Sequence, residues 1–150
     1  DVVLMAAEAY NETGTDRQKA WDLLNSVRTR AEATSITEAN YDEMMSARKK
    51  THNLTFIDDS TPERKFRTAL YWERGFELAF EGQCKYDLIR WGVLGKALKL
   101  FGEISSVNQK ENKPYPAYRN FTEGKHELFP IPLKEIQSNP KLNGMNNNGY

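Results

Sequence analysis

Residues 73–92 read ERGFELAFEGQCKYDLIRWG and join the two most regular helical patterns of the chain. The upstream pattern, residues 62–81, repeats apolar side chains at helical spacing. It begins with Pro62 after a run of Asp, Ser and Thr, which are the residues preferred at the start of a helix. Gly82 is the expected end of this helix, because glycine often closes a helix in a left-handed conformation.

A second amphipathic pattern follows over residues 86–101. Gly92 and Gly95 weaken its middle, because a glycine inside a helix costs about 1 kcal/mol relative to alanine. Together the two patterns predict a pair of helices over residues 62–101.

Residues 1–32 predict a helical hairpin. Apolar positions recur at helical spacing on both sides of a polar turn that contains Gly14, and Thr15 with Gln18 fits a capping box at the start of the second helix. Such hairpins are the unit of tetratricopeptide-like arrays, and one hairpin cannot bury both of its faces. Because the pattern starts inside a helix, we expect the protein to continue upstream of Asp1.

The rest of the chain is less regular. Residues 33–61 are interpreted as a variable insert, in which residues 41–50 fit a short helix. From residue 102 onward the helical pattern fades, and five prolines indicate a loop-rich tail over residues 102–150. The predicted fold class is therefore mainly α, with a tetratricopeptide-like hairpin, two longer helices and an extended C-terminal tail.

The composition excludes several classes of protein. The 150 residues include 21 Lys and Arg and 21 Asp and Glu, so the chain lacks the basic surplus of a nucleic-acid binder. No apolar run approaches the roughly 18 residues that span a bilayer. The single cysteine, Cys84, rules out an internal disulfide, and we expect its thiol to be buried. His52 and His126 lack ligand spacing, so we predict neither a metal site nor a cofactor.

Three carboxylates, Glu73, Glu77 and Glu81, recur every four residues on one predicted helix face. Paired carboxylates can act as the acid and base of glycoside hydrolysis, so a glycoside hydrolase is one hypothesis. However, groups stacked along one helix face do not flank a sugar ring, and Arg74 and Lys85 are close enough in sequence to neutralise them. We therefore favour structural ion pairs over catalysis.

Aromatic side chains are the candidate ligand contacts. Tyr115 and Tyr118 lie among prolines in the predicted tail, where loops often carry function, and Trp72 lies on the long helix. These three are chosen from residue type alone. Trp91 comes shortly after the apolar run Leu88–Ile89 and is expected in the core. From the residues alone, the chain is a mainly helical binding or scaffold protein, and an adaptor for another protein remains an alternative.

Four stretches of the chain also match known family motifs. Residues 73–92 follow the pattern ER-x-x-EL-x-FEG-x-x-x-x-DL-x-RWG at every fixed position. The other three are DVVLMAAEAYNE at residues 1–12, LNSVRTRA at residues 24–31, and a closing segment at 129–150 with FPIP, Asn139-Pro140 and a final Gly-Tyr. In this order, they resemble the C-terminal part of the RagB/SusD family of nutrient-binding outer-membrane lipoproteins of Bacteroidetes. Asn148 stands where that family usually has proline, and residues 33–61 are not covered.

The resemblance implies a function that spacing alone does not show. It implies a helical protein, anchored by a lipid upstream of this chain, which sits at the cell surface over a TonB-dependent, SusC-like outer-membrane transporter. It also implies binding of an oligosaccharide or polysaccharide and its delivery without cleavage, so we expect no enzymatic activity. The resemblance assigns no ligand-binding residue to these motifs.

The motif at residues 73–92 has an expected structural role. Its charged side chains on two successive helices should lock those helices together at the Gly82 turn, because the planar fork of arginine binds a carboxylate bidentately. Trp91 should then fill the gap, and the pair of Asp87 with Arg90 should be buried. The residues assigned to this role are Glu73, Arg74, Glu77, Asp87, Arg90 and Trp91.

Overall fold

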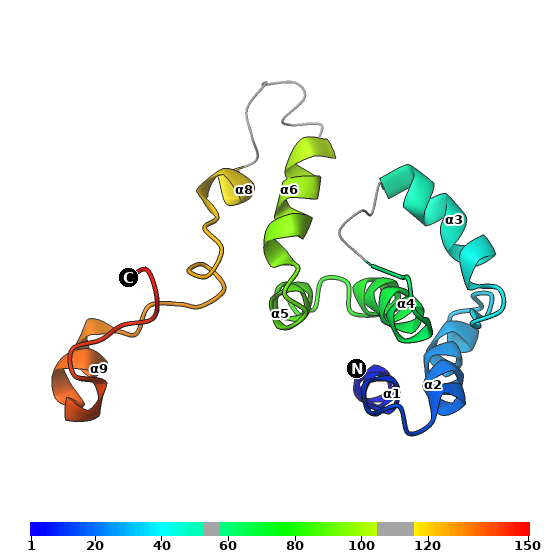
Figure 1. Cartoon of the computed structure of the whole chain (residues 1–150), viewed down its shortest axis with the longest axis horizontal. Coiled ribbons are helices and arrows are strands. Elements are labelled where there is room, and N and C mark those ends of the chain that lie inside the picture. Colours follow the sequence, from blue (N-terminus) through cyan, green and yellow to red (C-terminus); the bar gives the residue numbers. More distant parts are fainter. Residues whose placement is uncertain (53–57, 105–115) are drawn as a thin grey trace. The chain divides into compact units, whose positions relative to one another are not determined.

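The computed structural model describes residues 1–52, 58–104 and 116–150 and divides the chain into two compact units, Asp1–Cys84 and Lys85–Tyr150. Regular structure in the described residues is helical throughout, without strands, so the predicted mainly α fold is confirmed (Figure 1). The first unit contains α1 (Val2–Thr13), α2 (Arg17–Arg30), α3 (Tyr41–His52) and α4 (Pro62–Glu77).

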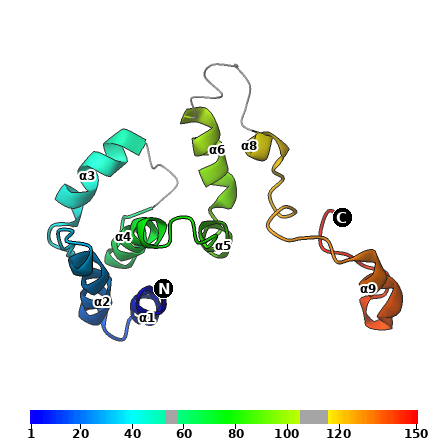
Figure 2. The same ribbon diagram turned by 180° about the vertical axis from the view of Figure 1, so that it is seen from behind.

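In the first unit, α1 and α2 pack against each other as the predicted helical hairpin (Figures 1 and 2). Gly14 ends α1 in the left-handed conformation, with φ of 66°. The predicted capping box at Thr15 is wrong, because Asp16 caps α2 instead. Its carboxylate accepts a hydrogen bond of 2.8 Å from the backbone N–H of Lys19, one residue closer to the helix than the predicted cap.

Helix α4 packs on both α1 and α2 and completes the core that these two helices begin. Its buried side chains include Phe66, which meets Trp21 of α2 edge to face with 4.8 Å between ring centroids. Thr61 caps the helix by accepting a hydrogen bond from the N–H of Arg64 at 3.4 Å, as the run before Pro62 predicts.

The end of α4 differs from the prediction. The helix stops at Glu77, four residues before the expected end at residue 81. Phe80 and Gly82 both adopt left-handed conformations, with φ of 66° and 76°, so the backbone already turns before Gly82.

The segment after α2 contributes to the core of the first unit. Asn25 fixes it through two hydrogen bonds of 2.8 Å, one from its Nδ2 to the carbonyl oxygen of Ile36 and one from the N–H of Ile36 to its Oδ1. Ile36 and Tyr41 are fully buried. The Tyr41 hydroxyl donates a 3.0 Å hydrogen bond to Asp59, and burial raises the pKa of this hydroxyl above its usual value.

In the second unit, the helix expected over residues 86–101 is two helices, α5 (Cys84–Arg90) and α6 (Leu94–Ile104). Gly92 adopts φ of 66° between them and ends the first, a stronger effect than the predicted weakening. The short helix α8 (Pro116–Asn120) packs on α6. A Cβ added at Gly95 would lie 2.8 Å from the ring of Phe121, so this close approach requires glycine.

The tail beyond α8 contains α9 (Leu133–Ser138) and the 3₁₀ turn η1 (Pro140–Leu142). Asparagines near its end hold it together. Asn146 Oδ1 accepts a 2.7 Å hydrogen bond from the N–H of Ile131, and Asn147 Nδ2 donates one of 2.7 Å to the carbonyl oxygen of Phe129. The tail is therefore loop-rich, as predicted, but cross-linked by side-chain hydrogen bonds.

Candidate functional site

The first carboxylate of the motif, Glu73, forms a buried ion pair. Its Oε2 lies 2.6 Å from Nη1 of Arg28 on α2, and the two side chains are 7% and 5% exposed. Arg28 also donates from Nε to the carbonyl oxygen of Thr34 at 2.8 Å. Glu73 thus pairs as expected, but with a residue 45 positions away instead of with a basic neighbour on its own helix.

The other two carboxylates of the predicted series separate from it. Glu77, the last residue of α4, pairs with Arg30 of α2 at the surface. Glu81 lies beyond the end of α4 and is exposed, so it shares no helix face with the other two. The three glutamates therefore do not line a common cleft.

Arg74 is buried on α4, and its Nη1 lies 2.7 Å from Oδ1 of Asp1. This contact ties α4 to the start of α1. The predicted lock between Arg74 or Glu77 and the side chains of α5 involves residues of different units and stays a prediction.

In the second unit, Asp87 is buried and accepts a 2.9 Å hydrogen bond from Nε of Arg90. The expectation of a fully buried pair is wrong, because the Arg90 side chain is 41% exposed. Trp91 is half-buried instead of lying in the core, and the Arg90 guanidinium stands 4.6 Å from the centre of its ring. An arginine that covers an indole at the surface holds the ring without burying it.

Trp72, one of the candidate ligand contacts, belongs to an aromatic group on α4. It is half-buried, its ring stacks on Phe76 with centroids 5.8 Å apart, and it meets Tyr71 edge to face at 5.7 Å. Phe76 is 55% exposed, so this stack reaches the surface of the unit. Burial raises the pKa of Tyr71 to about 12, so Tyr71 lies on the buried side of this aromatic group.

Of the other two candidate contacts, Tyr118 lies on α8. Tyr118 is half-buried and packs on α6, because a Cβ added at Gly102 would lie 3.3 Å from its ring. Tyr115 lies outside the described residues. Cys84, which was expected to be buried, is exposed at the start of α5.

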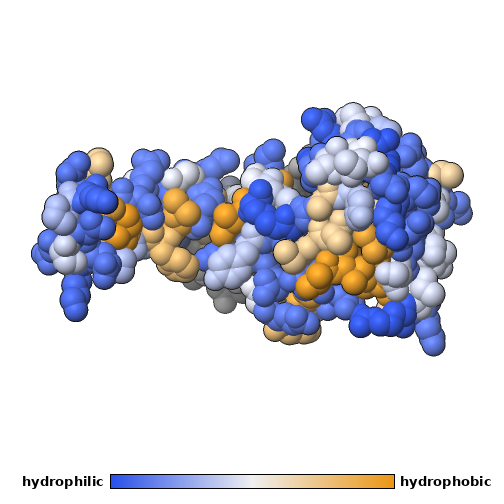
Figure 3. All heavy atoms as spheres, turned by 90° about the horizontal axis from the view of Figure 1, so that it is seen from below, coloured by the Kyte–Doolittle hydropathy of each residue, from blue (hydrophilic) through white to orange (hydrophobic). Residues whose placement is uncertain are grey.

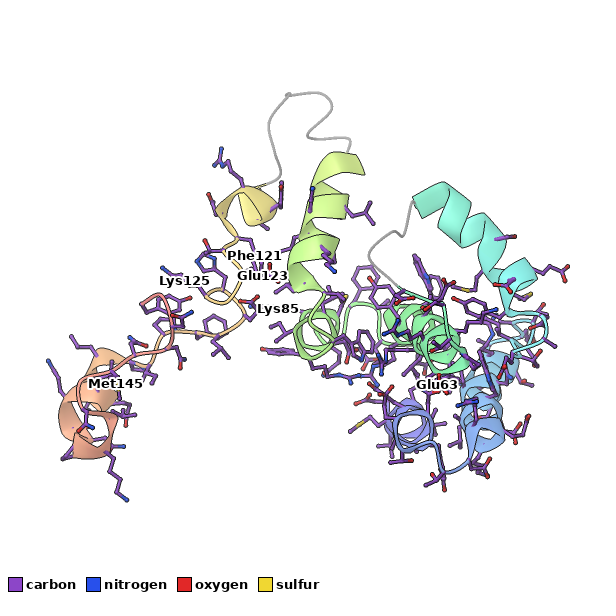
Figure 4. The ribbon with its side chains drawn as sticks, viewed as in Figure 1. Glu63, Lys85, Phe121, Glu123, Lys125 and Met145 are labelled. Carbon is purple, nitrogen blue, oxygen red and sulfur yellow. The ribbon has the colours of Figure 1, made fainter. Side chains whose placement is uncertain are left out.

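Two surface contacts of the second unit were not predicted. Lys85 Nζ lies 4.7 Å from the ring centre of Phe129, and Lys125 Nζ lies 4.6 Å from that of Tyr150. We call these four residues the cation–aromatic patch (Figure 4 labels its two lysines). Contacts that join residues 44 and 25 positions apart leave no periodic signal in a sequence, although the mixture of Lys, Phe and Tyr in the tail is visible there.

The first unit also carries an apolar surface, which Figure 3 shows from below. The most exposed apolar side chains of α1 are Val2, Val3 and Met5. One face of the hairpin therefore stays uncovered within this unit, in line with the expectation that a single hairpin cannot bury both of its faces.

Comparison with known proteins identifies the family. The model of the SusD family matches residues 1–150, the whole chain. The chain belongs to the SusD family. SusD-like protein P25 of Formosa agariphila is 36% identical over 100% of this chain and 23% of its own length. SusD-like protein P2 of the same organism is 31% identical over 100% of this chain and 24% of its own length.

This SusD-family chain thus spans about a quarter of the length of the curated relatives that it matches. No solved structure matches it. Among residues 1–52, 58–104 and 116–150, none of the helices combines the length and the apolar character needed to cross a bilayer.

Proposed function

We propose that this SusD-family protein is a non-catalytic, glycan-binding component of an outer-membrane nutrient uptake system. The match of the SusD family model to residues 1–150 is the observation that carries the proposal. In this role the protein is held at the cell surface by a lipid anchor and passes oligosaccharide to a TonB-dependent, SusC-like transporter.

The environment of the glutamates supports binding without cleavage. A general acid or base must come within hydrogen-bond reach of its substrate. Glu73 is buried against Arg28, and Glu77 is held by Arg30. Neither side chain is placed to flank a glycosidic bond, so the hypothesis of a glycoside hydrolase gains no support from these residues.

Ligand contacts are proposed at the exposed aromatic groups. Trp72 with Phe76 offers stacked rings at the surface of the first unit, and sugar rings present CH faces that pack on aromatic rings. Tyr118 offers a half-exposed ring in the second unit, and Tyr115 remains in the proposal from residue type alone.

Affinity electrophoresis in gels that contain a panel of polysaccharides tests the proposal. We expect at least one polysaccharide to retard the complete protein, and Trp72→Ala to reduce that retardation. Tyr10→Ala, which removes an exposed aromatic ring of α1 that is not among the proposed contacts, is the matched control and should migrate as the unaltered protein does. A protein that no polysaccharide retards would contradict the proposal.

A second candidate function is that of an adaptor for another protein. The exposed apolar side chains of α1, Val2, Val3 and Met5, favour it, because such surfaces often mark protein contacts. The same gels separate the two functions, since an adaptor without a small ligand would be retarded by none of the polysaccharides.

A further inference from the structure

The two units carry opposite net charges although the whole chain is neutral. Residues 85–150 contain ten Lys and Arg against six Asp and Glu, whereas residues 1–84 contain eleven against fifteen. The second unit therefore has a net charge of +4 and the first a net charge of −4. A surface of one sign raises the local concentration of ligands of the opposite sign.

The cation–aromatic patch gives this positive charge a defined place. The Tyr150 hydroxyl donates a 3.1 Å hydrogen bond to the carbonyl oxygen of Leu128, so the ring of Tyr150 is tied to the backbone directly before Phe129. Phe129 is 70% exposed and Tyr150 is 45% exposed. The patch thus combines accessible rings with two ammonium groups.

The two lysines of the patch keep their charge available. Within the described part of the chain, neither Lys85 nor Lys125 lies within ion-pair distance of a carboxylate, whereas Arg90 is paired with Asp87 at 2.9 Å. Glu127, two residues after Lys125 in the sequence, uses its carboxylate differently: it accepts a 3.1 Å hydrogen bond from the N–H of Gly124. An ammonium held over a ring and not over a carboxylate can still pair with an incoming anion.

We propose that the cation–aromatic patch binds acidic glycans, that is, oligosaccharides that carry carboxylate or sulfate groups. The inference rests on the proposed function, because it names the class of glycan that the protein takes up. The rings of Phe129 and Tyr150 contact the CH faces of the sugar, and Lys85 and Lys125 pair with its anionic groups. A neutral sugar uses only the first of these contacts.

Titration calorimetry with the complete protein tests this assignment. The probes are an oligogalacturonate, a sulfated carrageenan oligosaccharide and a neutral galactan oligosaccharide of the same length. We expect at least one acidic probe to bind about tenfold more tightly than the neutral one, since it adds charge pairs with the two lysines to the contacts with the rings. High salt should reduce the difference, because it screens exposed charges.

Matched variants locate the site. The double variant Lys85→Gln with Lys125→Gln should lose the preference for acidic probes. The control, Lys134→Gln with Lys141→Gln, removes the same charge from exposed positions on α9 and η1 and should keep it. Glu123→Gln, which removes an exposed negative charge two residues before Lys125, should strengthen acidic binding.

The possible results are distinguishable. Equal affinity for acidic and neutral probes would overturn the inference and leave glycan binding intact, whereas no binding of any glycan would overturn the proposed function as well. An equal loss in both double variants would show a diffuse charge effect and refute the patch. Equally tight binding of anionic phospholipid vesicles would also refute it, because the occupant would then be a membrane surface.

Discussion

The ion pair of Arg28 with Glu73 offers the sharpest test of the structure. Replacing Arg28 with Met keeps a long side chain but leaves the Glu73 carboxylate buried without its cation. Removing one partner of a buried pair destabilises a protein by about 3–5 kcal/mol. Both side chains are at most 7% exposed, so the full range applies here. The variant also loses the hydrogen bond from Arg28 Nε to Thr34.

Urea unfolding followed by circular dichroism measures this loss. A destabilisation of about 4 kcal/mol should lower the urea midpoint by about 2 M, because the unfolding free energy of a small domain falls by about 2 kcal/mol per molar urea. The matched control is Arg30→Met, which breaks the pair with Glu77. Because the Arg30 side chain is 68% exposed, this variant should lose no more than about 1 kcal/mol.

A third variant keeps the test decisive if Arg28→Met does not fold. Combining Arg28→Met with Glu73→Leu removes both charges, and an apolar replacement of a buried pair is often neutral. This double variant should recover most of the lost stability. If Arg28→Met is no less stable than Arg30→Met, the pair is not buried as described and the reasoning is refuted.

Three further perturbations test other parts of the structure. Tyr71→Phe should reduce the loss of stability between about pH 10 and 12 in alkaline unfolding. The Tyr71 hydroxyl ionises near its usual pKa in the unfolded chain but only at about 12 in the folded protein, so the wild-type protein loses stability over this range as the pH rises. An unchanged pH profile would contradict this. Asn25→Ala should cost about 1–3 kcal/mol in urea unfolding, since it leaves the buried backbone groups of Ile36 without their partners. Gly95→Ala should lower the melting temperature, because its Cβ would lie 2.8 Å from the Phe121 ring, and a stable variant would show that the ring moves freely.

The sequence predicts the helices of the first unit well because their signals are local. A run of capping residues before Pro62 and a glycine after Thr13 lie within one turn of the helix ends that they determine. The end of α4 at Glu77 was missed, because Gly82 is a strong terminator and the apolar pattern continues past the true end. Local propensity cannot show that the backbone turns earlier.

Ion-pair partners were predicted less well. Glu73 has basic neighbours along the chain, but the structure pairs it with Arg28, which only the packing of α4 on α2 brings close. In the same way, the contact of Lys85 with Phe129 depends on how the tail folds back on its own unit. Such pairs follow from tertiary packing and leave no periodic trace in the sequence.

Among the candidate ligand contacts, residue type predicted where rings occur but not how exposed they are. Trp72 lies in a surface stack, and Tyr118 is partly covered by its packing against Gly102. Trp91 was expected in the core because it comes shortly after the apolar pair Leu88–Ile89, yet the exposed Arg90 covers it instead. Burial of a single ring depends on neighbours that are distant in sequence.

Reducing-end release during a day of incubation with a bound oligosaccharide tests the central claim most directly. The protein is first saturated with a glycan that retards it in affinity gels, and the number of reducing ends is then followed. Binding without cleavage predicts that the count stays at the level of the glycan alone and that the oligosaccharide is recovered intact. A steady increase that Glu77→Gln abolishes would contradict the account and identify the protein as a glycoside hydrolase.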